Sequence, residues 1–296
     1  MALVTICNHK GGTGKTTSVI HLAAAFGLSG RRVLVVDLDP QGFLTRMLGV
    51  DEPEVAASSL ALFGQEVDFR TLPTLPMRGF ELLPASSNMT RALRQLNRPT
   101  DVFWMKEALA AGYDHDLVLF DTAAAVSVFT MNALVASDFV LIPVTPEYQP
   151  VVGAEQTWGT VGLVKEKLNP GLQGAHFLLT QVDARKRDHA AYARYLHERY
   201  GDHILRAIIR THATLAEANR DGTTVFDRDV TARGARDYAN AADELLAIYF
   251  PDAERGDIAG GTRAPVGEPA AAATSPPSSI GAASAASTAW VSLDRV

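Results

Sequence analysis

A run of glycines, lysines and threonines close to the start of the chain has the residue types that bind phosphate groups. Glycines allow a tight turn whose backbone N–H groups point at phosphate oxygens, and the N-terminus of a following helix adds a partial positive charge. The spacing predicts that Lys15 reaches the β- and γ-phosphates of a nucleotide and that the Thr16 hydroxyl ligates Mg²⁺. The residues predicted to bind the nucleotide are Lys10, Gly11, Gly12, Thr13, Gly14, Lys15, Thr16 and Thr17.

The sequence on either side of this run supports the same interpretation. The run follows an apolar segment, residues 3–6, and opens residues 15–28, where apolar side chains recur at helical spacing. It departs from the pattern G-x-x-x-x-G-K-[ST] at one position, where His9 replaces the first glycine. A glycine-rich turn beside an unrelated Lys-Thr pair is the alternative, and the strand–loop–helix context favours the phosphate loop.

Three aspartates follow two other apolar runs. Asp37 and Asp39 come after residues 33–36, and Asp121 comes after residues 117–120. Side chains two residues apart on a strand point to the same side, and ligands bind at the carboxyl ends of parallel strands. Asp121 is therefore predicted to hold Mg²⁺ or its bound water. Capping of a turn is the alternative for the first pair, and it explains one aspartate more easily than two.

The order of apolar runs and helical patterns predicts the fold. Strands that alternate with helices form right-handed crossovers and a mostly parallel sheet. We predict an α/β fold, in which residues 1–251 form a single P-loop NTPase domain whose mostly parallel sheet is covered by helices on both faces. The predicted strands are residues 3–6, 32–36, 80–83, 117–120, 139–144, 177–180 and 204–209. The predicted helices are residues 15–28, 101–111, 154–168, 190–200 and 232–249.

The composition changes at residue 252. Thirty of the 45 residues in 252–296 are Ala, Ser, Pro, Gly or Thr. A segment of this kind buries too little apolar surface to offset the entropy of ordering. We therefore predict a flexible tail over residues 252–296.

Composition also excludes several classes of protein. Hydrophobic residues make up 47% of the chain and charged residues 20%, which is the balance of a globular protein. The single cysteine, Cys7, excludes a disulfide framework and an iron–sulfur cluster held by one chain. The N-terminus lacks a basic region, and the most apolar stretch, residues 117–144, contains Asp121 and Asp138. We expect neither a signal peptide nor a membrane span, and a cytoplasmic location.

Residues 8–17, Asn-His-Lys-Gly-Gly-Thr-Gly-Lys-Thr-Thr, resemble the deviant Walker A motif of the ParA/Soj/MinD group of ATPases, because Lys10 precedes the glycines. The resemblance implies that Lys10 contacts the partner subunit's nucleotide in a homodimer formed around two ATP–Mg²⁺. Residues 37–41 are similar to the group's D-x-D-P-Q segment, which implies that Asp39 orients the attacking water and that Asp37 lies near Mg²⁺ through a water. The predicted catalytic residues are Lys10, Lys15 and Asp39, and the predicted metal-site residues are Thr16, Asp37 and Asp121.

Further short matches extend the resemblance over residues 3–249, in the order and spacing of the group. They are residues 130–134, 142–148, 215–218 and 233–238. Two positions depart from the group. The Pro-Pro pair that follows the second acidic strand is replaced by Ala123-Ala124, which leaves the switch behaviour of that loop open. The basic residue before the L-x-E-A segment is replaced by Thr214, which leaves open whether the DNA-contacting positions are those of the group.

The distribution of charge favours the ParA/Soj type within the group. The net charge is −6, yet residues 185–236 contain eleven basic and seven acidic residues. A basic face on an acidic protein suits contact with the DNA backbone without base reading, although solvated helix faces are the alternative. The resemblance implies non-specific binding to double-stranded DNA on the nucleoid and a ParB-type partner that stimulates hydrolysis. The residues predicted to contact DNA are Arg210, Arg220, Arg185, Lys186 and Arg187.

Two alternative functions of the protein stay open, and so does the choice of residues that contact the adenine base. A MinD-like membrane-surface regulator needs a basic amphipathic C-terminal helix, which residues 252–296 do not resemble. A P-loop amide-forming synthetase needs a pocket of convergent polar residues that the sequence does not display. Gln181 and Asp183, at the end of a predicted strand, either contact the adenine base or cap the next helix.

Overall fold

The computed structural model of the protein describes residues 1–64 and 67–251. The predicted tail, residues 252–296, lies outside the described residues. The strands are β1 (Ala2–Ile6), β2 (Val33–Asp37), β3 (Leu75–Met77), β4 (Phe80–Leu83), β5 (Leu117–Asp121), β6 (Phe139–Val144), β7 (Gly174–Val182) and β8 (Ile204–Arg210). The α-helices are α1 (Lys15–Leu28), α2 (Phe43–Met47), α3 (Met89–Ala92), α4 (Trp104–Leu109), α5 (Val128–Ala136), α6 (Tyr148–Lys167), α7 (Arg187–Tyr200), α8 (Ala213–Arg220), α9 (Val225–Arg228) and α10 (Arg233–Tyr249).

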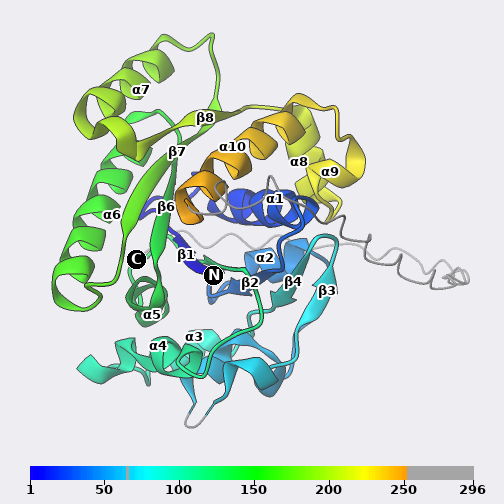
Figure 1. The fold of residues 1–296 in the computed structure, drawn as a ribbon, viewed down its shortest axis with the longest axis vertical. Helices are drawn as coiled ribbons and strands as arrows, with labels where there is room; N and C mark the ends of the chain where they lie inside the picture. The colour runs from blue at the N-terminus through cyan, green and yellow to red at the C-terminus, as the bar shows by residue number, and fades with distance from the viewer. Residues whose placement is uncertain (65–66, 252–296) are drawn as a thin grey trace, which may run out of the picture. The chain divides into compact units, whose positions relative to one another are not determined.

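One eight-stranded sheet runs through the described chain in the order β3-β4-β2-β5-β1-β6-β7-β8. Every neighbouring pair is parallel except β3 and β4. Helices pack on both sides of the strands (Figure 1). The prediction of a mostly parallel α/β fold is confirmed.

Side chains of the central strands alternate between two apolar clusters, as the period of a strand requires. In β5, Leu117 and Leu119 pack in the cluster that includes residues of α1 and α10. Val118 and Phe120 pack in the cluster that includes residues of α4 and α5. This alternation explains why β5 reads as a continuous apolar run in the sequence.

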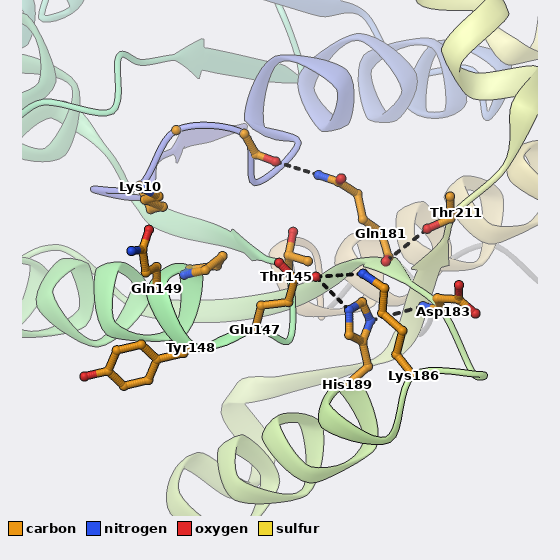
Figure 2. Close-up of a pocket in the computed structure, with 13 residues that line it drawn as sticks. Lys10, Thr145, Glu147, Tyr148, Gln149, Gln181, Asp183, Lys186, His189 and Thr211 are labelled. Atoms are coloured by element: carbon orange, nitrogen blue, oxygen red, sulfur yellow. Dashed lines mark hydrogen bonds and ion pairs between the residues drawn. The ribbon is translucent and has the colours of Figure 1, made fainter.

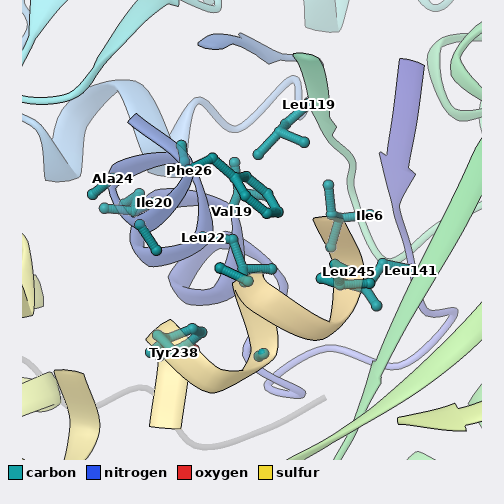
Figure 3. Packing of buried hydrophobic residues seen from close by; sticks show 14 of the residues in the cluster. Ile6, Val19, Ile20, Leu22, Ala24, Phe26, Leu119, Leu141, Tyr238 and Leu245 are labelled. Atoms are coloured by element: carbon teal, nitrogen blue, oxygen red, sulfur yellow. The ribbon is translucent and has the colours of Figure 1, made fainter. Parts of the chain in front are cut away.

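Helix α1 packs against both the sheet and α10 (Figure 3). Val19, Ile20 and Phe26 of α1 are each at most 1% exposed, and so is Tyr238 of α10. The Tyr238 hydroxyl lies 3.3 Å from Ser18 Oγ. The buried packing therefore holds the first turn of α1, where the phosphate loop ends, in a fixed position.

The structure adds elements that the sequence analysis did not predict. Strand β3 is short, lies antiparallel at the edge of the sheet and contains Pro76, so it shows no apolar run. Helices α2, α3, α8 and α9 have at most eight residues, too few to display a helical period. Helix α6 begins at Tyr148 rather than at residue 154. Pro150 is compatible with this earlier start, because it lies in the first turn, where proline is tolerated.

Candidate nucleotide site

The phosphate loop connects β1 to α1 and is held by a buried asparagine. Gly12 and Gly14 have φ angles of +78° and +80°, the left-handed region that residues with a side chain rarely adopt. Asn8 Nδ2 donates to the Pro143 carbonyl at 2.9 Å, and Asn8 Oδ1 accepts from the Lys10 N–H at 2.9 Å. Strand β6, which is next to β1 in the sheet, therefore supports the loop at Lys10.

The Lys15 ammonium group lies inside the loop. The residue is 8% exposed, and its Nζ donates to the Lys10 carbonyl at 3.1 Å. Burial lowers the pKa of Lys15, and the negative charge of Asp121 acts in the opposite direction. A phosphate group bound in the loop would supply the neighbouring charge and hydrogen-bond acceptors that a buried ammonium requires.

The register of the sheet brings two aspartates together at the ends of β2 and β5, and the first turn of α1 adds a threonine. Asp121 is the partner of Ile6 in β1 and of Asp37 in β2. The Thr16 hydroxyl donates to Asp121 Oδ2 at 2.8 Å. Burial, followed by the charge of Asp37, raises the pKa of Asp121 well above its ordinary value. Asp121 Oδ1 is buried and has no hydrogen-bond partner within the described residues, so an acceptor is left unsatisfied at this point.

The two aspartates near the end of β2 have different environments. Asp37 is fully buried, and its Oδ2 accepts from the N–H and the hydroxyl of Thr45 at 3.0 and 2.7 Å. Its Oδ1 accepts from the Asp39 N–H at 3.1 Å, and burial raises the pKa of Asp37 to about 6. Asp39 is only half-buried and lines the cleft in front of the loop. Asp37 thus organises the turn that carries Asp39.

That cleft, called here the phosphate-loop cleft, has a volume of about 550 Å³. Lys15, Thr16 and Asp39 line one part of it, and residues of α8 and of the preceding loop line another. Its size lies within the range of about 300–1,000 Å³ that is usual for small-molecule sites. The cleft therefore has room for a ligand larger than a phosphate group alone.

A second cleft of about 700 Å³, called here the Lys10 cleft, lies beside the loop (Figure 2). Glu147 belongs to its lining, and Glu147 Oε1 lies 2.9 Å from Lys186 Nζ and 3.0 Å from His189 Nε2. Lys10 lines this cleft but not the phosphate-loop cleft, whereas Lys15 lines only the latter. The two lysines of the loop therefore face different spaces.

Gln181 lies between the two clefts and lines both of them. Its backbone has a φ of +53°, its Nε2 donates to the Gly12 carbonyl at 2.6 Å, and its carbonyl accepts from the Thr211 hydroxyl at 3.0 Å (Figure 2). Asp183 lines only the Lys10 cleft and pairs with Arg185. Of the two residues predicted to reach an adenine base, only Gln181 lies at the phosphate-loop cleft.

Two of the residues predicted to contact DNA lie in different environments near that cleft. Arg210 lines the phosphate-loop cleft, and its guanidinium pairs with the buried Asp237 at 2.5 Å. The Arg220 side chain is 72% exposed and pairs with Asp221 at 3.0 Å. Arg220 therefore faces solvent to a greater extent than Arg210.

The other three residues predicted to contact DNA lie at the start of α7. Arg185, Lys186 and Arg187 are all exposed. Arg185 pairs with Asp183, and Lys186 pairs with Glu147 at the Lys10 cleft. This segment places three exposed cations side by side, outside the phosphate-loop cleft.

The sequence analysis missed two threonines, at or just after neighbouring strands, that hold the loop and the end of β1, from which the loop starts. The Thr180 hydroxyl donates to the Thr13 carbonyl at 2.8 Å, and the Thr122 hydroxyl donates to the Ile6 carbonyl at 2.9 Å. Each of these threonines lies at the end of an apolar run, as Asp121 does. A polar residue at the end of a predicted parallel strand is the signal that could have identified them.

Gly153 of α6 lies against the phosphate loop. A Cβ at position 153 would lie 2.8 Å from Lys10 Cβ and 2.9 Å from Asn8 Oδ1. We expect Gly153→Ala to displace the loop at Lys10 and to lower the free energy of unfolding by about 1–3 kcal/mol, because overpacking a close contact has this cost. Urea unfolding would measure the change.

Gly159→Ala is the matched control. Gly159 lies in the same helix, and a Cβ at that position would meet no atom within 4 Å. Since alanine is the better helix former by about 1 kcal/mol, this variant should be more stable than the wild type. Equal changes in the free energy of unfolding of Gly153→Ala and Gly159→Ala would contradict a close contact between α6 and the loop.

The chain is similar to known ATPases over most of its length. Residues 1–174 match the model of a family described as an AAA domain. The chromosome-partitioning ATPase Soj of Thermus thermophilus is 37% identical over 246 residues, which cover 82% of this chain and 95% of the relative. The chromosome partitioning protein ParA of Myxococcus xanthus is 31% identical over 262 residues, which cover 87% and 92%. A solved structure of cobyrinic acid a,c-diamide synthase from Mycobacterium smegmatis, with bound ADP and magnesium, is 31% identical with a TM-score of 0.70 and covers 83% and 95%.

Proposed function

The chain belongs to the family of P-loop ATPases that includes the chromosome-partitioning proteins Soj and ParA, and on this premise we propose that it is a DNA-partition ATPase. In the proposed cycle, two copies bind ATP and Mg²⁺ and form a homodimer that binds double-stranded DNA without sequence preference. A ParB-type partner stimulates hydrolysis, and the ADP-bound chains leave the DNA. The protein would accordingly be found on the nucleoid.

The observation that carries this proposal is the separation of the two lysines of the loop. Lys15 is buried beside the phosphate-loop cleft, where it would bind the chain's own nucleotide. Lys10 lines the neighbouring cleft instead. A cation in that position remains available for a triphosphate carried by a second copy, and the developing charge of a transferred phosphoryl group requires such compensation.

The residues around Asp121 suit Mg²⁺. No group of three or more His, Cys, Asp or Glu in residues 1–64 and 67–251 could hold a metal ion alone. Mg²⁺ in nucleotide sites is bound by one or two protein oxygens together with phosphate and water, so it does not need such a group. Thr16 and Asp121 offer a hydroxyl and an unsatisfied buried carboxylate oxygen, and these two would hold the ion. When bound, Mg²⁺ would neutralise charge on the phosphates.

Hydrolysis would depend on the position of Asp39. Its carboxylate lines the phosphate-loop cleft with Lys15 and Thr16, where it would accept a hydrogen bond from the attacking water. Asp37 would support this role indirectly, because it accepts the Asp39 N–H and holds the turn. With Asp39 as the only proposed water-orienting group, intrinsic turnover should be slow, and stimulation by a partner would set how long the dimer stays on DNA.

Lys10→Ala tests the cross-subunit role. We expect the variant to bind ADP with an affinity within about threefold of the wild type, since Lys10 does not line the phosphate-loop cleft. With ATP and Mg²⁺ it should remain a monomer, because the contact to the second nucleotide is lost. Light scattering with each nucleotide measures the mass.

Lys167→Ala provides the control for this variant. Lys167 is an exposed lysine at the end of α6, and its loss changes the net charge by the same amount. It should form the ATP-dependent dimer normally. An ATP-dependent dimer of Lys10→Ala would contradict the proposed contact.

Co-sedimentation with ATP tests the DNA-binding role. The wild type should pellet with DNA at low salt and much less at high salt, because phosphate contacts release counterions. Replacing Arg185, Lys186 and Arg187 together by alanine should weaken pelleting, and unchanged pelleting would exclude this segment from the DNA-binding surface. Pelleting with liposomes instead of DNA would favour the MinD-like alternative. Separately, none of the helices in the described part of the chain has the length and apolar character needed to cross a membrane.

One observation favours a second candidate, an amide-forming synthetase. The solved structure named cobyrinic acid a,c-diamide synthase is 31% identical to this chain, the same sequence identity as that of two ParA and Soj relatives. A synthetase would consume ATP only with a carboxylic acid and a nitrogen donor, and it would not pellet with DNA. The same sedimentation experiment therefore separates the two functions.

A further inference from the structure

Asn219 in α8 reaches the helix that follows the phosphate loop. Its Nδ2 donates to Thr17 Oγ1 at 3.1 Å, and both residues line the phosphate-loop cleft. Thr17 lies in the first turn of α1, directly after Lys15 and Thr16. Asn219 thus connects α8 to the part of α1 where a phosphate would bind.

A buried histidine lies on the same side of α1, one turn further along. His21 is fully buried, and the Val225 N–H, at the start of α9, lies 3.4 Å from its Nδ1. Burial lowers the pKa of His21 to about 4, while the charge of Asp227 and hydrogen bonding to Asn219 act in the opposite direction. The ring is therefore neutral at pH 7. Since Nδ1 accepts, the ring hydrogen is on Nε2.

This tautomer determines how the Asn219 amide is oriented. His21 Nε2 and Asn219 Oδ1 are both buried, and neither has a hydrogen-bond partner of normal geometry in the described ranges. With the amide oxygen toward His21, the Nε2–H has an acceptor on its side, in agreement with the effect of Asn219 on the pKa of His21, whereas the reverse orientation would oppose two donors. The amide nitrogen of Asn219 consequently faces Thr17.

Because Thr17 Oγ1 accepts from Asn219, its own hydrogen is left to donate to another group. Thr17 lines the phosphate-loop cleft, and a nucleotide phosphate supplies acceptor oxygens there. We propose that Asn219 is a positioning residue that directs the Thr17 hydroxyl at a phosphate of the nucleotide, and that His21 holds Asn219 in this orientation. This inference rests on the proposed binding of nucleotide in the phosphate-loop cleft.

A double-variant cycle tests the inference. Asn219→Leu keeps the approximate size of the side chain and removes the donor, so the affinity for ADP with Mg²⁺ should fall about fivefold to tenfold, as expected for one hydrogen bond. Thr17→Val should cause a loss of affinity of similar size. The double variant should lose no more affinity than the single variant that binds ADP more weakly. Isothermal calorimetry measures the three affinities. A purely structural role for Asn219 would not produce this non-additivity.

Thr223→Val is the matched control. The Thr223 hydroxyl is buried near the end of α8 without a partner among the described residues, and it does not line the cleft. This variant should bind ADP as the wild type does. If it loses as much affinity as Asn219→Leu, loosening of the segment is the cause and the inference is wrong.

The tautomer of His21 can be measured in the wild type, so the test does not depend on a variant that folds. Nitrogen-15 chemical shifts should place the hydrogen on Nε2, and a hydrogen on Nδ1 would overturn the inference. Additive losses in Asn219→Leu and Thr17→Val would also overturn it. A wild-type protein that binds no ADP would instead refute the proposed function.

Discussion

Lys15→Ala should weaken binding of both ADP and ATP by about 100-fold or more. Lys15 is a buried ammonium at the phosphate-loop cleft, and a charge-assisted hydrogen bond between such a group and a phosphate contributes on the order of 3 kcal/mol. Alanine would also leave Asp121 and the bound phosphates without the positive charge of Lys15. Calorimetric titration with each nucleotide in the presence of Mg²⁺ measures the loss.

The fold should survive this change, because the only hydrogen bond of Lys15 Nζ within the described structure goes to the Lys10 carbonyl. Circular dichroism should therefore show wild-type helix content. Lys165→Ala, at an exposed lysine of α6, is the control and should bind nucleotide normally. An unchanged affinity of Lys15→Ala for ADP would remove the basis for the whole site.

Asp39→Ala should retain ATP binding within about threefold and lower the rate of hydrolysis by about 100-fold or more, the range expected when a positioned acid–base group is lost. Asp39 lines the cleft, but it forms no part of the phosphate loop. Its removal also takes a negative charge away from Lys15. Since hydrolysis ends the dimeric state in the proposed cycle, the ATP-bound dimer should accumulate. Phosphate release and light scattering measure the two effects.

Asp51→Ala is the control for this variant, because Asp51 is an exposed aspartate that does not line the phosphate-loop cleft. It should hydrolyse ATP and dissociate at wild-type rates. Rapid hydrolysis by Asp39→Ala would exclude Asp39 as the residue that orients water. A loss of ATP binding would instead give Asp39 a role in holding the nucleotide.

The phosphate loop and its acids could be predicted because each depends on local order in the sequence. The loop needs only its glycines, Lys15 and the helical period that follows, and α1 has the predicted bounds of residues 15–28. Asp121 was found at the end of a buried run, and the register of β5 with β1 brings it to Thr16. Parallel strands with a common edge make this convergence a property of the topology.

The remaining parts of the site depend on contacts between distant segments. The hydrogen bond between Asn219 and Thr17 joins residues 202 positions apart. Asn219 also lies in α8, a helix too short to show a helical period in the sequence. The sequence alone predicts that Arg210 is an exposed basic residue. Its ion pair with Asp237 forms only when α10 packs beside β8, and the sequence does not reveal that packing. Local patterns contain no information on such pairs, and a single sequence offers no other signal for them.

Gln181 is a residue with a strained backbone conformation, and it separates the phosphate-loop cleft from the Lys10 cleft. Its amide is tied to Gly12 and its carbonyl to Thr211, and these two residues line both clefts as well. A ligand that changes the shape of one cleft must therefore displace residues that also line the other cleft. Substitutions of these shared residues that change nucleotide preference would alter the Lys10 cleft too. Nucleotide preference and the shape of the Lys10 cleft therefore have to be redesigned together.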